Sequence, residues 1–128
     1  MKLLLLASVG GAIGAGARFL VNQAFATRGL IGFPWATLTV NVVGGFLMGA
    51  VMVLVLDRFD GSPEIRTFLA TGILGGLTTF SAFTYELSQM IAADGIASPR
   101  LLAYIALSVL LSLAALYAGM AFSRALIS

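Results

Sequence analysis

Four apolar stretches constrain the fold of this chain more than any other feature. They cover residues 3–25, 35–56, 65–92 and 101–123, and short connections that contain glycine or proline separate them. Each is at least as long as the roughly 20 residues that a helix needs to cross a bilayer. Inside the hydrocarbon only helices and closed barrels satisfy their backbone polar groups. We therefore predict an all-α integral membrane protein with a single domain, residues 1–128, and four transmembrane helices.

The composition excludes several classes of protein. The chain is 60% hydrophobic and 9% charged, against about 25% charged residues in a typical soluble domain. It has no cysteine and no histidine, which excludes disulfides, histidine general-base catalysis and most transition-metal sites. The net charge of +2 comes from scattered basic residues, so we expect no nucleic acid as a partner. No nucleophile–base pair is visible, and we do not expect an enzyme.

The basic residues near the helix ends give a weak signal for orientation. Lys and Arg in short loops set the orientation of membrane helices. A small bias therefore predicts a chain that inserts both ways, and a dual-topology chain would form an antiparallel homodimer. Four residues fall on one side of the predicted bilayer and two on the other: Lys2, Arg58, Arg66 and Arg124, against Arg28 and Arg100.

The third stretch contains a polar segment, Gly75–Glu86, that lipid alone does not accommodate. It holds two adjacent glycines, several hydroxyl side chains, two phenylalanines and a glutamate. Polar groups at membrane depth are tolerated only inside protein or along a watery path. Glycine and threonine also weaken a helix. We therefore predict a break in the third helix at residues 75–79, which would free backbone carbonyls to bind a cation.

Phe80 and Phe83 lie three residues apart within this segment and face the same side of a helix. Ordinary packing between helices is one interpretation. An aromatic ring has a positive edge and a negative face. Ring edges that point into a narrow path would attract a small anion and repel a cation, and this is the second interpretation.

Three hydroxyl residues repeat along the fourth stretch. Tyr104, Ser108 and Ser112 follow one another at intervals of four, which places them in one stripe along a helix. A lone serine in a membrane helix is usually satisfied by the carbonyl four residues earlier. Three aligned hydroxyls favour a polar track, with a helix–helix contact as the alternative.

Three further polar residues need partners inside the membrane. Arg18 would cost at least about 2.5 kcal/mol near the centre of a span, unless it snorkels to the interface. Asn41 has two donor hydrogens and two acceptor positions to satisfy, and it either joins helices or meets an anion. Glu86 is the only acid well inside a predicted span, and its role and charge state stay open.

These motifs together resemble the Fluc fluoride channels, also called CrcB, over essentially the whole chain. The relatives often read Thr-Phe-Ser-Thr-Phe-Ser where this chain has Thr79-Phe-Ser-Ala-Phe-Thr84, so Ala82 lacks a hydroxyl. The Tyr104 stripe matches as well. The other matching pieces are Gly14–Arg18, Ala36–Asn41 and Gly75–Ser81, followed by Phe83 and Glu86.

The resemblance implies a passive fluoride-selective channel that exports fluoride across the plasma (inner) membrane of a bacterium. It implies an antiparallel homodimer with two pores. Carbonyls of Gly75 and Thr78 from both subunits would hold a structural sodium ion at the dimer interface, and Arg18 would lie near a vestibule that collects anions. The residues expected along the fluoride path are Thr39, Asn41, Phe80, Ser81, Phe83, Tyr104, Ser108 and Ser112.

Two other functions fit parts of the pattern. Small proton-coupled multidrug exporters also have four short helices and form antiparallel dimers. Their working glutamate lies in the first helix, where this chain carries Arg18. A helper subunit that only organises other membrane proteins would explain small residues at helix contacts. It would not explain the hydroxyl stripe together with the aromatic pair.

Overall fold

The structure, a computed structural model, describes residues 1–128 and is entirely helical. Four helical segments are long and apolar enough to cross a membrane, which confirms the predicted fold class. Three of them are continuous helices: α1 spans Lys2–Thr27, α2 spans Trp35–Arg58 and α6 spans Pro99–Ile127. The helix α6 therefore extends four residues past the predicted end at residue 123.

The third span, Pro63–Asp94, is interrupted. Its backbone leaves the helix at Thr78, which is extended with φ −75° and ψ 156°. The predicted break is thus present, although Gly75 and Gly76 remain helical and the chain breaks only at the threonines. A π-helical portion was not predicted. The pieces are α3 (Pro63–Arg66), the π-helix η1 (Thr67–Leu74), α4 (Gly75–Leu77) and α5 (Ser81–Asp94).

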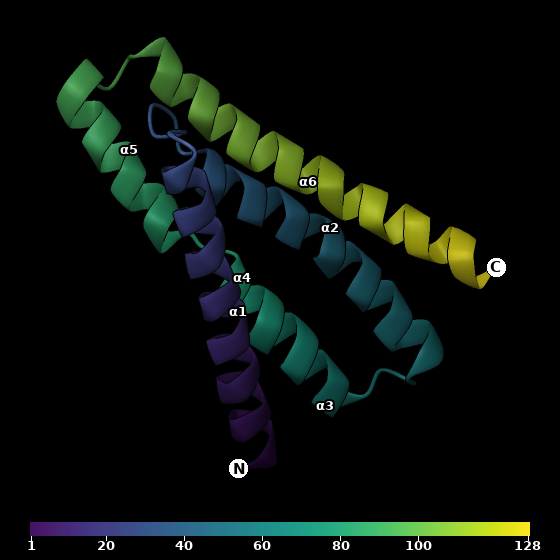
Figure 1. Cartoon of the computed structure of the whole chain (residues 1–128). Coiled ribbons are helices and arrows are strands. Elements are labelled where there is room, and N and C mark those ends of the chain that lie inside the picture. Colours follow the sequence, from purple (N-terminus) through teal and green to yellow (C-terminus); the bar gives the residue numbers. More distant parts are fainter.

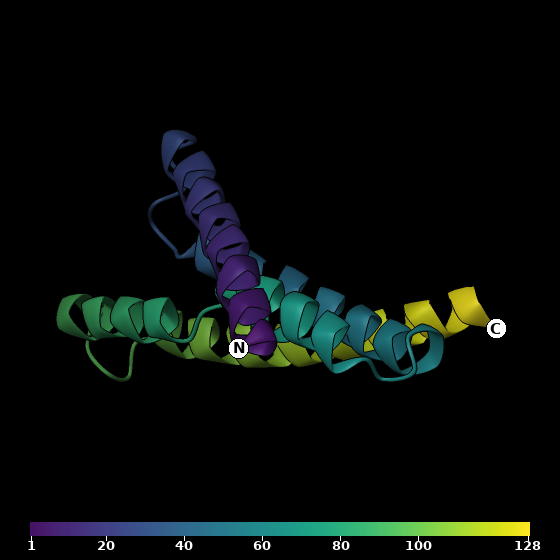
Figure 2. The same cartoon turned by 90° about the horizontal axis from the view of Figure 1, so that it is seen from below.

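Two helix pairs organise the chain, and glycine brings their backbones together. In Figures 1 and 2, α2 and α6 run side by side, whereas α1 crosses the segment from α3 to α4. A Cβ atom on Gly14 of α1 would collide with the carbonyl of Ile73 in η1. A Cβ atom on Gly49 of α2 would collide with the carbonyl of Leu116 in α6. Such close contacts are typical of membrane helices, which gain little from hydrophobic burial against one another.

The single chain forms a thin, open layer. Figure 2 shows α1 rising away from the other helices, which lie roughly in one plane. Only 21 of the 128 residues are buried, and large apolar side chains on α1 and α6 are exposed. Lipid covers such surfaces at no hydrophobic penalty, and a second protein chain covers them equally well.

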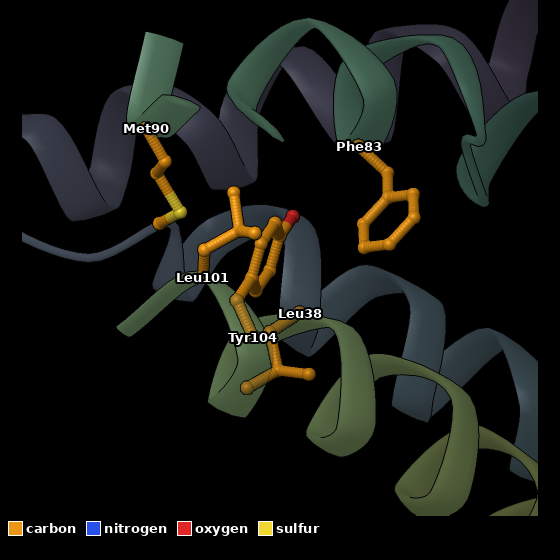
Figure 3. Packing of buried hydrophobic residues seen from close by; sticks show 5 residues of the cluster. All are labelled: Leu38, Phe83, Met90, Leu101 and Tyr104. Atoms are coloured by element: carbon orange, nitrogen blue, oxygen red, sulfur yellow. The ribbon is translucent and has the colours of Figure 1, made fainter. Parts of the chain in front are cut away.

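The largest cluster of buried apolar side chains joins α5 to the α2–α6 pair. Figure 3 shows Phe83 and Met90 pointing from α5 towards Tyr104, Leu101 and Leu38. Tyr104 is completely buried in the middle of this cluster. The cluster therefore holds α5 in place on the far side of the helix break.

Candidate functional site

Asn41 of α2 bridges the helix break. Its Nδ2 donates to the carbonyl of Thr79 at 3.1 Å, and its Oδ1 accepts from the Thr79 backbone N–H at 2.8 Å. Asn41 thus satisfies both backbone groups of Thr79 that a continuous helix would have paired. The structure shows the helix-joining role that we considered for Asn41. One Nδ2 hydrogen remains for another acceptor, since the amide has two.

The hydroxyl of Thr79 starts the next helix. Its Oγ1 accepts from the N–H of Ala82 at 3.1 Å, as the side chain of an N-cap residue does. The Ser81 hydroxyl lies 3.2 Å from the same atom. These contacts explain why a helix resumes immediately after the break.

An open groove of about 390 Å³ lies beside the break. It runs between α2, residues 78–83 and α6, and no charged side chain lines it. The groove brings together many of the residues predicted from the sequence. Thr39 and Ser81 do not line it, and Thr39 is half-buried elsewhere on α2. The predicted residues in the groove are Asn41, Thr78, Phe80, Phe83, Ser108 and Ser112.

Two hydroxyl groups in the groove have no partner. The Oγ atoms of Ser108 and Ser112 are buried, yet neither makes a hydrogen bond within the chain. A buried hydroxyl without a partner costs about 1–3 kcal/mol. Native proteins keep such groups rarely, and each one calls for an explanation. An acceptor that enters the groove would provide the missing partner.

The two phenylalanines contribute differently to the groove. Their ring centroids are 5.5 Å apart and the rings are tilted by 44°. Phe83 is buried and packs against the ring of Tyr104 at 5.1 Å. Phe80 is 75% exposed, so one of its sides has no neighbour within the single chain.

Glu86 is held by two hydroxyl donors. Its Oε1 accepts from Thr37 Oγ1 at 2.6 Å, and its Oε2 accepts from Tyr104 Oη at 2.6 Å. Tyr104 therefore departs from the serines of its stripe, because its hydroxyl already has a partner. We did not predict Thr37 as a site residue, although its position one turn before Asn41 was a usable signal.

Glu86 also borders a second cavity, of about 470 Å³, near the ends of α1, α5 and α6. We call it the end cavity. Most of its lining is apolar, and its polar residues include Asn22, Gln89 and Arg100. Phe83 lines the groove, and Tyr104 packs against Phe83 and donates a hydrogen bond to Glu86. These three side chains therefore lie between the groove and the end cavity.

Arg18 contacts the last helical turn before the break, in the same stretch of chain as Gly75 and Thr78. Arg18 lines neither cavity, and its Nε donates to the carbonyl of Gly76 at 3.2 Å. Its predicted place at a vestibule stays a prediction. The N–H groups that a helix would direct to Gly75 and Thr78 bond elsewhere: Thr79 donates to Asn41, and Ala82 donates to the Thr79 hydroxyl.

The comparison with known families identifies the chain's relatives. Residues 5–120 match the family described as CrcB-like protein, Camphor Resistance (CrcB). The chain belongs to this family. The match covers most of the chain and confirms the resemblance inferred from its motifs.

Individual members of the CrcB-like family are similar over nearly their full length. A "Fluoride-specific ion channel FluC" of Rhizobium meliloti is 43% identical over 99% of this chain and 100% of its own. Proteins of the same name from Rhizobium etli and Rhodospirillum centenum are 49% and 40% identical. These two alignments cover 96% and 97% of this chain and 97% of each relative.

The family and the four spans together settle the class and location of the protein. It is a multi-pass membrane protein, and in bacteria the membrane is the inner membrane. The relatives are named as channels, which confirms that this family member is not an enzyme.

Proposed function

We propose that this protein is a fluoride-specific channel that lets fluoride leave the cytoplasm passively. The names of its full-length relatives support fluoride as the ion. The observation that carries the proposal is the pair of buried, unpartnered hydroxyls of Ser108 and Ser112 in the groove. They are donors without acceptors, aligned along one helix face, and an anion is the ligand that such groups take.

Fluoride is small and tightly hydrated, so a selective path replaces its water with donors at close range. The groove offers the serine hydroxyls, the remaining Nδ2 hydrogen of Asn41 and the edges of the Phe80 and Phe83 rings. It offers no fixed positive charge. Several weak neutral sites bind an ion well enough for entry and loosely enough for release.

Passive flow is sufficient for export. Fluoride enters a cell as neutral hydrogen fluoride when the medium is acidic, and it ionises in the more neutral cytoplasm. An inside-negative membrane potential then drives the anion out with about 2.3 kcal/mol per charge per 100 mV. An open path for fluoride therefore lowers its cytoplasmic concentration without ATP or proton coupling.

The assembly in this proposal is an antiparallel homodimer with two pores. The thin layer formed by one chain and the exposed Phe80 support a second copy that covers the open side of the groove. The weak bias of the basic residues supports insertion in both orientations.

The proposal also includes a structural sodium ion at the dimer interface, held by carbonyls of Gly75 and Thr78 from both subunits. The donor chemistry fits: both carbonyls have lost their usual helical donors, because Thr79 and Ala82 bond elsewhere. Neutral carbonyl oxygens of broken membrane helices are ligands for Na⁺. The chain contains no group of three acidic, histidine or cysteine side chains for a different metal. A bound ion would neutralise the repulsion between facing carbonyls.

Fluoride efflux from liposomes tests the proposal. The purified protein is reconstituted with internal potassium fluoride, and a fluoride electrode records release after a potassium ionophore is added. We expect rapid release of fluoride and far slower release in matched liposomes that hold chloride. No fluoride release from a folded protein would contradict the channel. Proton-coupled uptake of an organic cation without fluoride release would identify an exporter instead.

The same assay tests the two rings. We expect Phe80→Ile and Phe83→Ile each to slow fluoride release by about tenfold while the oligomer remains intact, because both substitutions remove ring edges from the path. Phe122→Ile on α6, outside the groove, is the control for loss of an aromatic side chain. Unchanged release in both groove variants would remove the rings from the proposed path.

A further inference from the structure

The contact between Arg18 and Gly76 is not explained by an anion path. Arg18 lies within the apolar part of α1 and is half-buried. Its Nε donates to the Gly76 carbonyl at 3.2 Å, across 58 residues of sequence. An arginine at this depth needs acceptors. Here its partner is a backbone carbonyl in the last turn before the helix break.

The helix break leaves the Gly76 carbonyl without its normal donor. In a continuous helix this carbonyl would accept from the N–H of Phe80, four residues later. The extended backbone at Thr78 moves Phe80 out of that position, and no backbone hydrogen bond from Phe80 to Gly76 forms. Arg18 supplies the missing donor, in the way that a capping side chain completes the end of a helix.

The packing of α1 fixes where the Arg18 side chain begins. A Cβ atom on Gly76 would lie 2.5 Å from the carbonyl of Gly11 and 3.0 Å from the nitrogen of Ala15. The backbones of α1 and α4 are therefore in direct contact. Arg18 follows Ala15 by about one turn of α1. The side chain of Arg18 therefore reaches the end of α4 from a helix whose backbone is held in place by this close packing.

We propose that Arg18 is a positioning residue for the helix break. Its Nε–H holds the Gly76 carbonyl, and this bond keeps the neighbouring carbonyls of Gly75 and Thr78 directed away from their own helix. The effect on cation binding rests on the proposed sodium site. The effect on the backbone does not, since the break is present in the single chain.

The hydrogen bond and the charge of Arg18 predict opposite effects on sodium. A fixed positive charge near a cation site weakens binding, so removing the charge alone strengthens it. Removing the hydrogen bond frees the Gly76 carbonyl and weakens binding. Of the five N–H groups of the Arg18 guanidinium, only the one on Nε donates to Gly76.

Two neutral substitutions separate these effects. In Arg18→Gln, the amide nitrogen is as many bonds from the backbone as Nε of arginine, so it can still donate to Gly76. Arg18→Met has a similar length and no donor. Both remove the same charge. Arg28→Met is the matched control, because Arg28 also donates to a carbonyl of α1, that of Ala24, but lies outside the break.

The first measurement is hydrogen exchange of the backbone amides in peptides that cover residues 75–82, in sodium-free buffer. We expect Arg18→Gln and Arg28→Met to exchange like the unsubstituted protein, and Arg18→Met to exchange about tenfold faster. Equal exchange in Arg18→Gln and Arg18→Met would overturn the proposal, whether or not sodium binds.

The second measurement is thermal stability of the purified protein as sodium replaces N-methylglucamine, which gives the apparent sodium affinity. We expect Arg18→Met to bind sodium at least about tenfold more weakly than Arg18→Gln. Stronger binding in both variants would assign Arg18 a purely electrostatic role and overturn its positioning role. Sodium-independent stability of the unsubstituted protein would instead contradict the proposed sodium site, and the exchange measurement would still decide the role of Arg18.

Discussion

The two halves of the broken third span are held by different kinds of contact. The half before the break, from α3 to α4, packs backbone to backbone against α1 through Gly14 and Gly76. The half after it, α5, is held by the apolar cluster of Figure 3 and by the hydrogen bonds of Glu86. Direct backbone contact leaves no space between α1 and α4 for a side chain, whereas the polar side chains around α5 offer exchangeable partners. The groove and the end cavity both contact α5, the groove through Phe83 and the end cavity through Glu86 and Gln89.

Substitution of Gly14 is expected to have the largest effect and tests the backbone-packed half. A Cβ atom in Gly14→Ala would collide with the Ile73 carbonyl, so we expect a loss of about 3 kcal/mol or more, or failure to fold. Gly16→Ala is the control, since nothing lies within 4 Å of its Cβ position. Thermal unfolding in detergent measures both variants. Equal stability would show that α1 approaches this half less closely than the structure has it.

Asn41→Leu tests the bridge between the halves. It removes both hydrogen bonds to Thr79, and we expect a loss of about 2–3 kcal/mol together with loss of fluoride release. Gln23→Leu, at an exposed position of α1 outside both cavities, is the control for loss of an amide. If Asn41→Leu unfolds at the same temperature as the control, the break holds its shape without the asparagine.

The donors of Glu86 test the polar half. Tyr104→Phe and Thr37→Val each remove one of its two short hydrogen bonds, and we expect each to cost about 1.5–2 kcal/mol. The double variant is expected to cost less than the sum, because Glu86 can turn towards the end cavity once both donors are lost. Thermal unfolding of all three variants measures the coupling, and strict additivity would show that the two bonds act independently.

The groove serines are the only tested positions at which we expect no loss of stability. Ser108→Ala and Ser112→Ala remove hydroxyls without partners in the chain, so we expect no loss of stability and a gain of up to about 1–3 kcal/mol for each. Fluoride release from liposomes should nevertheless fall, by about tenfold in the double variant. Ser8→Ala, whose hydroxyl bonds the Leu4 carbonyl on an exposed face, is the control for both measurements. A destabilised double variant with normal release would make these serines structural.

Helical spacing was enough to predict much of the groove. Tyr104, Ser108 and Ser112 share a helix face at any tertiary arrangement, because a side-chain direction repeats nearly every four residues. Spacing did not distinguish the tyrosine from the serines. Tyr104 bonds Glu86, which approaches from another helix, whereas the two serines face the groove without partners.

The position of the helix break also could not be predicted to the residue from the sequence. Glycine and threonine are both weak helix formers, so residues 75–79 were predicted as a unit. In the structure Gly75 and Gly76 stay helical because α1 packs directly on this turn, and the helix ends where Asn41 bonds the backbone of Thr79. Local propensity indicated a weak region, and contacts from α1 and α2 selected the residue.

The sequence by itself determined the four spans, the polar positions along them and the family. Apolar length and helical periodicity are local properties, and they survive any arrangement of the helices. Only the tertiary structure decided the partners of Asn41, Glu86 and Arg18. Asn41 bonds Thr79, which is 38 residues away in the sequence. Glu86 bonds Thr37 across 49 residues, and Arg18 bonds Gly76 across 58. A buried polar group must find a donor or acceptor, but which one it finds depends on how the helices pack.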